Sequence, residues 1–215
     1  MKIKSFLGGY DKNFCYLIWC KNTRFAAIVD PSVKIDAIAD FISKNNLILN
    51  KILITHTHND HIFYLNDWIK LYPKISLFGY DLKLNQKVKI YNLSHNDIVS
   101  IGQELITTLY TPGHYDDSIC FWNQKNNAIF AGDTIFVGRT GRTVSCRSNI
   151  DDLYHSVYKI ILKLPKQTMI YPGHHYGHKQ NITIEENIKN SDFFNCSSKL
   201  EFVDVMKKFE ENRKY

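Results

Sequence analysis

The 215-residue chain lacks the features that mark several large classes of protein. No stretch approaches the ~18 consecutive apolar residues that a transmembrane helix needs, and residues 1–9 contain no apolar run long enough for the core of a signal peptide. The five cysteines are scattered and never form a C-x-x-C pair, so a disulfide framework is not indicated. We therefore expect a cytoplasmic protein in a reducing compartment, without a membrane partner.

The chain also has no large excess of one charge, no low-complexity linker and no internal repeat. Its 27 basic and 21 acidic residues give a formal net charge of +6. The basic residues are too widely spread along the chain to indicate a nucleic-acid partner, but the charge is compatible with a small anionic substrate. The length suits one sizeable core better than two. We expect a single domain over residues 1–215 with a short helical tail at about 177–215.

Short apolar runs that end at chain-breaking residues predict most of the β-structure. Residues 14–20 and 25–30 are predicted to form a hairpin through the polar turn 21–24. Further strands are expected at residues 51–55, 105–111, 120–122, 128–131 and 169–171.

Apolar residues at helical spacing predict three helices. The first covers residues 35–42, and the second begins after the capping residue Asn149 and ends before Pro165. The tail helix begins at the capping box formed by Ser198 and Glu201. Its buried face is predicted to consist of Leu200, Val203, Met206 and Phe209.

Four of the predicted strands lead directly into a histidine or aspartate. The strand at 51–55 leads into the cluster His56-Thr57-His58-Asn59-Asp60-His61, and the others lead into His114, Asp133 and His174. Loops at one edge of a β-scaffold can bring such side chains together at a cleft. This organisation is typical of a functional site.

Imidazole and carboxylate are the ligands that Zn²⁺ and Fe²⁺ accept, at ~2.0–2.2 Å for zinc. A lone histidine in a turn is usually only a polar surface residue, but three histidines and an aspartate within six residues outweigh that interpretation. Because alternating side chains of a turn cannot all point at one ion, we expect two ions, whose coordination the later ligands complete.

These motifs resemble those of the metallo-β-lactamase superfamily. The matching segments are Thr55-His56-Thr57-His58-Asn59-Asp60-His61, Thr111-Pro112-Gly113-His114, Ala131-Gly132-Asp133-Thr134 and Tyr171-Pro172-Gly173-His174-His175-Tyr176. The resemblance implies an α+β fold, namely an αββα sandwich of two mixed β-sheets flanked by helices. It also implies that His56, His58 and His114 hold one metal ion, that Asp60, His61 and His174 hold the other, and that Asp133 bridges them.

Within the superfamily, the sequence resembles the glyoxalase II (hydroxyacylglutathione hydrolase) and persulfide dioxygenase branches. Both carry a basic residue nine positions after the bridging aspartate, here Arg142, which binds the glycine carboxylate of glutathione. Both also carry an aromatic hydroxyl two residues after the last metal histidine, here Tyr176. Arg139 is a weaker second candidate for the substrate anion. The planar fork of an arginine suits a carboxylate because it can bond both oxygens.

The main hypothesis is hydrolysis of a glutathione thioester by a metal-activated hydroxide. Two ions ~3.5–4 Å apart can share a water and lower its pKa towards neutrality. Asp133 would bridge the ions and Asp60 would orient the hydroxide, so both are candidate catalytic residues. Zn²⁺ is the first choice of metal, and Fe²⁺ is the alternative.

Two other functions stay open. A persulfide dioxygenase would hold a single Fe²⁺ through His56, His114 and Asp133 and oxidise glutathione persulfide. A non-catalytic metal-binding module is the other. The chain departs from the glyoxalase II pattern at Ile62-Phe63, where Gly-Gly is common, and at Val144 after Gly-Arg-Thr.

Overall fold

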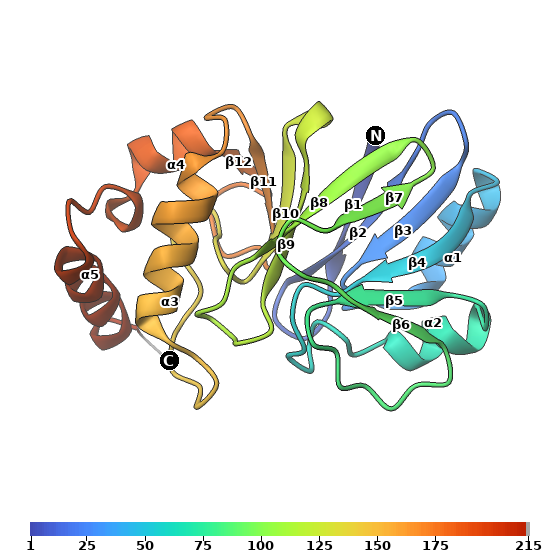
Figure 1. The fold of residues 1–215 in the computed structure, drawn as a ribbon, viewed down its shortest axis with the longest axis horizontal. Helices are drawn as coiled ribbons and strands as arrows, with labels where there is room; N and C mark the ends of the chain where they lie inside the picture. Colours follow the sequence, from blue (N-terminus) through green and yellow to red (C-terminus); the bar gives the residue numbers. More distant parts are fainter. Residues whose placement is uncertain (214–215) are drawn as a thin grey trace.

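Two six-stranded β-sheets lie face to face at the centre of the protein, in a computed structural model that describes residues 1–213 (Figure 1). The first sheet has the order β1-β2-β3-β4-β5-β6, and the second has the order β12-β11-β10-β9-β8-β7. The strands of the first are β1 (Lys2–Gly8), β2 (Asn13–Trp19), β3 (Phe25–Val29), β4 (Ile48–Leu53), β5 (Ser76–Gly79) and β6 (Lys89–Asn92). Those of the second are β7 (Ile98–Ile101), β8 (Glu104–Tyr110), β9 (Ile119–Asn123), β10 (Ala128–Gly132), β11 (Met169–Pro172) and β12 (Ile182–Thr183).

Helices cover the outer face of each sheet (Figure 1). Two of them, α1 (Ile35–Lys44) and α2 (Leu65–Leu71), lie on the first sheet. On the second lie α3 (Ile150–His155), which continues through a π turn (Ser156–Ile160) and a 3-10 turn (Ile161–Lys163), together with α4 (Ile184–Asn190) and α5 (Lys199–Glu211). Short 3-10 turns occupy Gln124–Asn126 and Asp192–Phe194. No helix within residues 1–213 is both long enough and apolar enough to span a bilayer.

Both sheets are mixed, as expected. The pairs β3-β4, β4-β5, β5-β6 and β10-β11 are parallel, and the other pairs are antiparallel. The carboxyl ends of parallel neighbours lie at the same edge of a sheet. The residues that follow β10 and β11 are therefore delivered to one edge. The α+β prediction of an αββα sandwich is confirmed.

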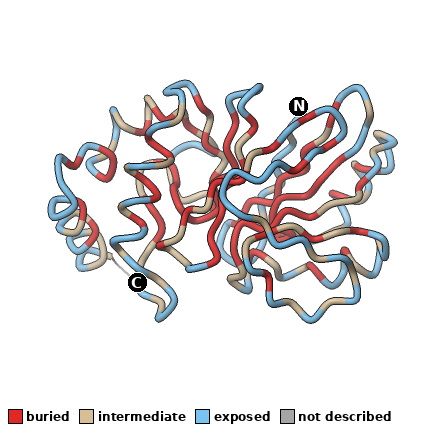
Figure 2. Tube along the Cα trace, viewed as in Figure 1, coloured by how far each residue is buried: buried red, intermediate tan, exposed pale blue. Residues whose placement is uncertain are grey.

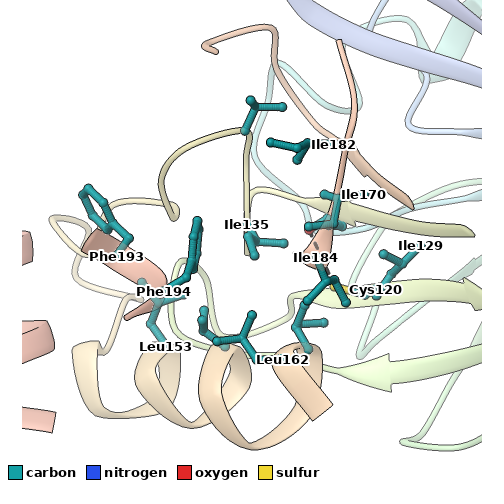
Figure 3. Packing of buried hydrophobic residues seen from close by; sticks show 14 of the residues in the cluster. Cys120, Ile129, Ile135, Leu153, Leu162, Ile170, Ile182, Ile184, Phe193 and Phe194 are labelled. Atoms are coloured by element: carbon teal, nitrogen blue, oxygen red, sulfur yellow. Dashed lines mark hydrogen bonds between the residues drawn. The ribbon is translucent and has the colours of Figure 1, made fainter. Parts of the chain in front are cut away.

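Three apolar layers hold the sandwich together, and Figure 2 shows the buried segments concentrated in the central strands. Between the sheets lie aromatic side chains that include Phe14, Phe121 and Phe130. Beneath α1 and α2, Ile38 and Trp68 are fully buried. The third layer joins the second sheet to α3, α5 and the Asp192–Phe194 turn, and Figure 3 shows its tight packing.

The predicted face of the tail helix is only partly correct, because Met206 and Phe209 do pack against the core but Leu200 does not. Leu200 is 76% exposed, whereas Phe202 and Met206 are buried against the second sheet and α3. The helix does begin at Ser198, whose hydroxyl accepts a hydrogen bond from the Glu201 amide at 3.2 Å. The Glu201 carboxylate, however, accepts from the amide of Ser197 at 2.7 Å, so the capping box is offset by one residue.

Candidate metal centre

The seven histidines and aspartates predicted to bind metal come together at one edge of the sandwich. They lie in loops that follow four strands, with the His56–His61 segment after β4, His114 after β8, Asp133 after β10 and His174 after β11. Their donor atoms form three overlapping groups: His56, His58 and His114; His56, His61 and Asp133; and Asp60, His61 and His174. Within each group all donor atoms lie within 4.8 Å of one another.

The first group has the geometry of a three-nitrogen site. His58 Nδ1 lies 2.9 Å from His56 Nε2 and 3.0 Å from His114 Nε2. Ligand atoms at the corners of a tetrahedron with bonds of 2.0–2.1 Å are separated by ~3.3 Å. The three rings therefore present their nitrogens at a spacing close to the one that a tetrahedral cation requires.

The third group, on the other side of Asp133, combines two histidines with the carboxylate of Asp60. His61 Nε2 lies 3.1 Å from His174 Nε2, and Asp60 Oδ2 lies 3.3 Å from His174 Nε2 and 3.8 Å from His61 Nε2. Asn13 Nδ2 donates to Asp60 Oδ2 at 2.8 Å, which fixes the orientation of this carboxylate.

Asp133 lies between the two groups. One of its oxygens, Oδ1, is 3.2 Å from His61 Nε2, and the other is 3.5 Å from His114 Nε2 and 3.4 Å from His174 Nε2. Oδ1 is buried and has no hydrogen-bond partner. Buried oxygens without a partner are rare because they have lost their hydration without compensation. A cation between the groups would supply the missing partner, so the residues fit a metal centre.

Hydrogen bonds behind the rings fix three of the histidines with Nε2 towards the site. His61 Nδ1 lies 2.9 Å from Asp30 Oδ2, His114 Nδ1 donates to the Arg142 carbonyl at 2.8 Å, and His174 Nδ1 donates to the Asp11 carbonyl at 2.7 Å. A carbonyl oxygen can only accept, so Nδ1 carries the proton and Nε2 is left to bind an ion. Such outer contacts are typical of metal-binding histidines.

The sequence interpretation missed Asp30. Its side chain also accepts from the amide of Thr55 at 2.8 Å and from the Thr55 hydroxyl at 2.7 Å, and so anchors the start of the histidine-rich loop. A signal was present, because Asp30 directly follows β3 and precedes Pro31, the pattern that identified the other ligands. Asp11 and Asn13 carried no such signal.

Two glycines let the backbone approach the centre. A Cβ at Gly173 would collide with Asp133 Oδ1 and with the ring of His61, and one at Gly141 would collide with the Asp133 carbonyl and the ring of His114. Any larger residue at either position would displace a ligand.

The electrostatics divide the ligands into two sets. Burial, reinforced by His61, lowers the pKa of His56 well below its ordinary value, and burial beside His114 lowers the pKa of His58 to about 4. In the other set, which includes Asp133 and His174, burial also disfavours the charged forms of the side chains. Even so, the charges of His174 and His61 hold the pKa of Asp133 well below its usual range, and Asp133 and Asp60 raise the pKa of His174 to about 9.

A cavity of about 340 Å³ opens over the ligands. The two predicted substrate residues, Arg142 and Tyr176, both line it, together with Arg139 and Arg213. Five of the seven predicted ligands also line it, whereas His56 and His61 are buried. The cavity contains one more arginine, Arg213, than the sequence had indicated.

Both predicted substrate residues already form side-chain hydrogen bonds within the protein. Arg142 Nε and Nη2 bond the two carboxylate oxygens of Glu210 in α5, at 2.8 and 2.9 Å. The Tyr176 hydroxyl donates to Asp11 Oδ2 at 2.5 Å, and its ring stacks on that of His174 with the centroids 4.7 Å apart.

The residues that depart from the glyoxalase II pattern do not line this cavity. Ile62 packs against the core between the first sheet and its helices. The side chains of Phe63 and Val144 are exposed.

Comparisons with known proteins agree with this architecture. Residues 8–174 match the family model described as the metallo-beta-lactamase superfamily. A hydroxyacylglutathione hydrolase from Francisella tularensis subsp. novicida (strain U112) is 37% identical over 177 residues, which cover 82% of this chain and 68% of that protein. Among solved structures, ETHE1 from Myxococcus xanthus has a TM-score of 0.88 at 27% identity, covering 100% of this chain and 92% of that one. A metallo-beta-lactamase from Staphylococcus aureus subsp. aureus COL has a TM-score of 0.83 at 26% identity, covering 100% and 68%. The chain therefore belongs to the metallo-beta-lactamase superfamily.

Proposed function

We propose that the protein is a metal-dependent hydrolase that cleaves glutathione thioesters, as a hydroxyacylglutathione hydrolase does. The observation that carries the proposal is that seven metal-type ligands come together beside a cavity lined by three arginines. The 37% identity to a hydroxyacylglutathione hydrolase supports the choice of substrate. A cationic wall suits glutathione, which is an anion at neutral pH.

The ligands are assigned to two divalent cations. His56, His58 and His114 would hold one, Asp60, His61 and His174 would hold the other, and Asp133 would contact both. This donor set of imidazoles and carboxylates suits Zn²⁺ first and Fe²⁺ as the alternative. When bound, such a pair of cations lowers the pKa of a water molecule and polarises the thioester carbonyl.

The chain's own residues orient the reactants. Asp60, held by Asn13, presents its carboxylate towards the site as a hydrogen-bond acceptor for the attacking water. The lowered pKa of Asp133 keeps that carboxylate ionised, and the hydrogen bonds behind His61, His114 and His174 keep the rings in place. The leaving thiol has an ordinary pKa near 8.5 and needs little protonation, so no separate general acid is required. A cytoplasmic location is part of the proposal, and the free state of the five cysteines supports it.

Turnover of S-lactoylglutathione by anaerobically purified protein tests the proposal, followed as loss of thioester absorbance. We expect rapid hydrolysis that a chelator abolishes and that Zn²⁺ or Fe²⁺ restores. Asp133→Ala should lose both activity and metal. Fully metallated wild-type protein that leaves the thioester intact would refute the proposed reaction, as would an Asp133→Ala variant with full metal occupancy and normal turnover.

The second candidate is the persulfide dioxygenase reaction. The similarity to ETHE1 supports it, at the lower sequence identity of 27%. His56, His114 and Asp133 would then hold a single Fe²⁺. Oxygen uptake on glutathione persulfide, without hydrolysis of S-lactoylglutathione, would favour this alternative.

A further inference from the structure

Arg139 differs from the other two arginines of the cavity because it is not paired with Glu210. Its guanidinium lies 4.2 Å from the ring centroid of Tyr176, 5.0 Å from that of Phe209 and 5.3 Å from that of Phe136. Among residues 1–213, it forms no ion pair with an acidic side chain. Burial lowers the pKa of Arg139, because the charge has lost part of its hydration. A partly desolvated cation of this kind favours an anionic ligand.

The turn that carries Arg139 is held rigidly. Phe136 N donates to the Arg139 carbonyl at 2.7 Å, which closes a tight hairpin between Ile135 and Thr140. The buried side chain of Asn187 in α4 bonds both the Phe136 carbonyl and the Gly138 amide at 2.8 Å. The guanidinium is thus positioned by a fixed loop and an aromatic surround, which reduces the entropy lost on binding a ligand.

Arg142, in contrast, is already paired. Its Nε and Nη2 both bond Glu210, so an internal carboxylate already occupies one two-pronged edge of the guanidinium and neutralises its charge. Tyr176 gives its only donor to Asp11. A guanidinium that stacks on an aromatic ring keeps its in-plane N–H groups available, and these can bond both oxygens of a carboxylate.

We infer that Arg139, and not Arg142, binds a carboxylate of the glutathione portion of the substrate. The inference rests on the proposed function for the identity of the substrate. Arg139 would act as a binding residue: it would fix the end of the substrate remote from the thioester while the metal ligands engage the carbonyl. Its loss should therefore weaken binding much more than it slows the chemical step.

Calorimetric binding of S-methylglutathione to the metallated protein tests this inference without requiring turnover, since the ligand is a thioether. Arg139→Gln should weaken binding by ~30-fold, as expected for the loss of charge-assisted hydrogen bonds. Arg139→Lys should recover part of the affinity because it keeps the charge but loses the planar fork. Lys208→Gln is the matched control: it makes the same charge change at an exposed position of α5 and should alter the affinity by less than ~2-fold.

Binding of a second ligand, the glycine amide of S-methylglutathione, identifies which carboxylate of glutathione Arg139 binds. If Arg139 binds the glycine carboxylate, the S-methylglutathione glycine amide should bind wild type and Arg139→Gln equally. If the variant still weakens binding of the amide, the γ-glutamyl carboxylate is the partner. Arg139→Gln also removes packing against three rings, so its melting temperature and metal content are measured alongside, and Arg139→Lys serves where the glutamine variant is unfolded.

The inference is overturned if folded, metallated Arg139→Gln binds S-methylglutathione within ~3-fold of wild type, or if wild type does not bind it at all. Failure of the proposed reaction gives a different result. Arg139-dependent binding by protein that leaves S-lactoylglutathione intact would refute thioester hydrolysis and keep the assignment of Arg139.

Discussion

Arg142 and Glu210 form a two-pronged ion pair between the loop that follows Asp133 and the last turn of α5, with N–O distances of 2.8 and 2.9 Å. The Arg142 carbonyl also accepts the hydrogen bond from His114 Nδ1. One residue therefore connects a metal ligand, through its backbone, to the C-terminal helix, through its side chain. The tail is thus part of the wall of the site.

Breaking this pair should loosen the tail by a small amount. Glu210→Gln is expected to lower the free energy of unfolding by ~0.5–1 kcal/mol, because the two side chains are 26% and 32% exposed and water screens their attraction. Urea denaturation measures the change. Glu211→Gln, which removes a more exposed pair with Lys207, is the control and should change stability less. Equal effects of the two substitutions would contradict a structural role for the Arg142–Glu210 pair.

Asp30 should control metal affinity although it lies behind the ligands. Asp30→Asn replaces the carboxylate that orients His61, and the expected loss of metal affinity is ~10–100-fold, as is typical for such outer contacts. Metal content after dialysis against graded chelator concentrations measures it. Asp36→Asn, on the exposed surface of α1, is the control. Retention of metal by Asp30→Asn at the chelator concentrations that wild type tolerates would rule out this role.

Removing the metal should destabilise the fold. A ligand present at ~1,000 times its dissociation constant stabilises the native state by ~4 kcal/mol. For a chain of this length, that corresponds to a fall in melting temperature of roughly 10 °C on chelation. Calorimetry of protein whose metal content is measured directly provides the test, and readdition of Zn²⁺ provides the control. An unchanged melting temperature after verified loss of metal would contradict it.

The strands that deliver the ligands were predictable because their signals are local. The apolar runs before His56, His114, Asp133 and His174 each end at a ligand or a chain-breaking residue, and the matching motifs occur in the order typical of the family. The strands β1, β5, β6, β7 and β12 and the helices α2 and α4 were not predicted as separate elements. In β6, for example, one residue is partly buried and three are exposed, so no clear alternation is present.

Contacts that depend on distant parts of the chain were not predictable. Nothing near Glu210 in the sequence indicates that it lies against Arg142, which is 68 residues away. The engagement of Tyr176 by Asp11 is likewise a tertiary contact, across 165 residues. Arg142 therefore fits a family pattern in sequence while its side chain is paired inside the molecule.

The two residues of α5 at which the prediction and the structure differ, Leu200 and Phe202, give a direct test of packing. Two apolar stripes overlap in this helix, and helical spacing alone favours Leu200 as readily as Phe202. In the structure Phe202 is fully buried against Tyr154 and Tyr158, with ring centroids 5.7 and 5.8 Å away, whereas Leu200 is 76% exposed.

Phe202→Ala should therefore lower the free energy of unfolding by ~3–5 kcal/mol, through lost burial and the cavity that remains. Leu200→Ala should stay within ~0.5 kcal/mol of wild type, as is usual for exposed positions. Urea denaturation of the two variants, with metal content held equal, measures both values. A larger loss for Leu200→Ala than for Phe202→Ala would mean that α5 packs through the opposite face. The Arg142–Glu210 pair would then have to be abandoned as well, because Glu210 reaches Arg142 only when Phe202 and Met206 face the core.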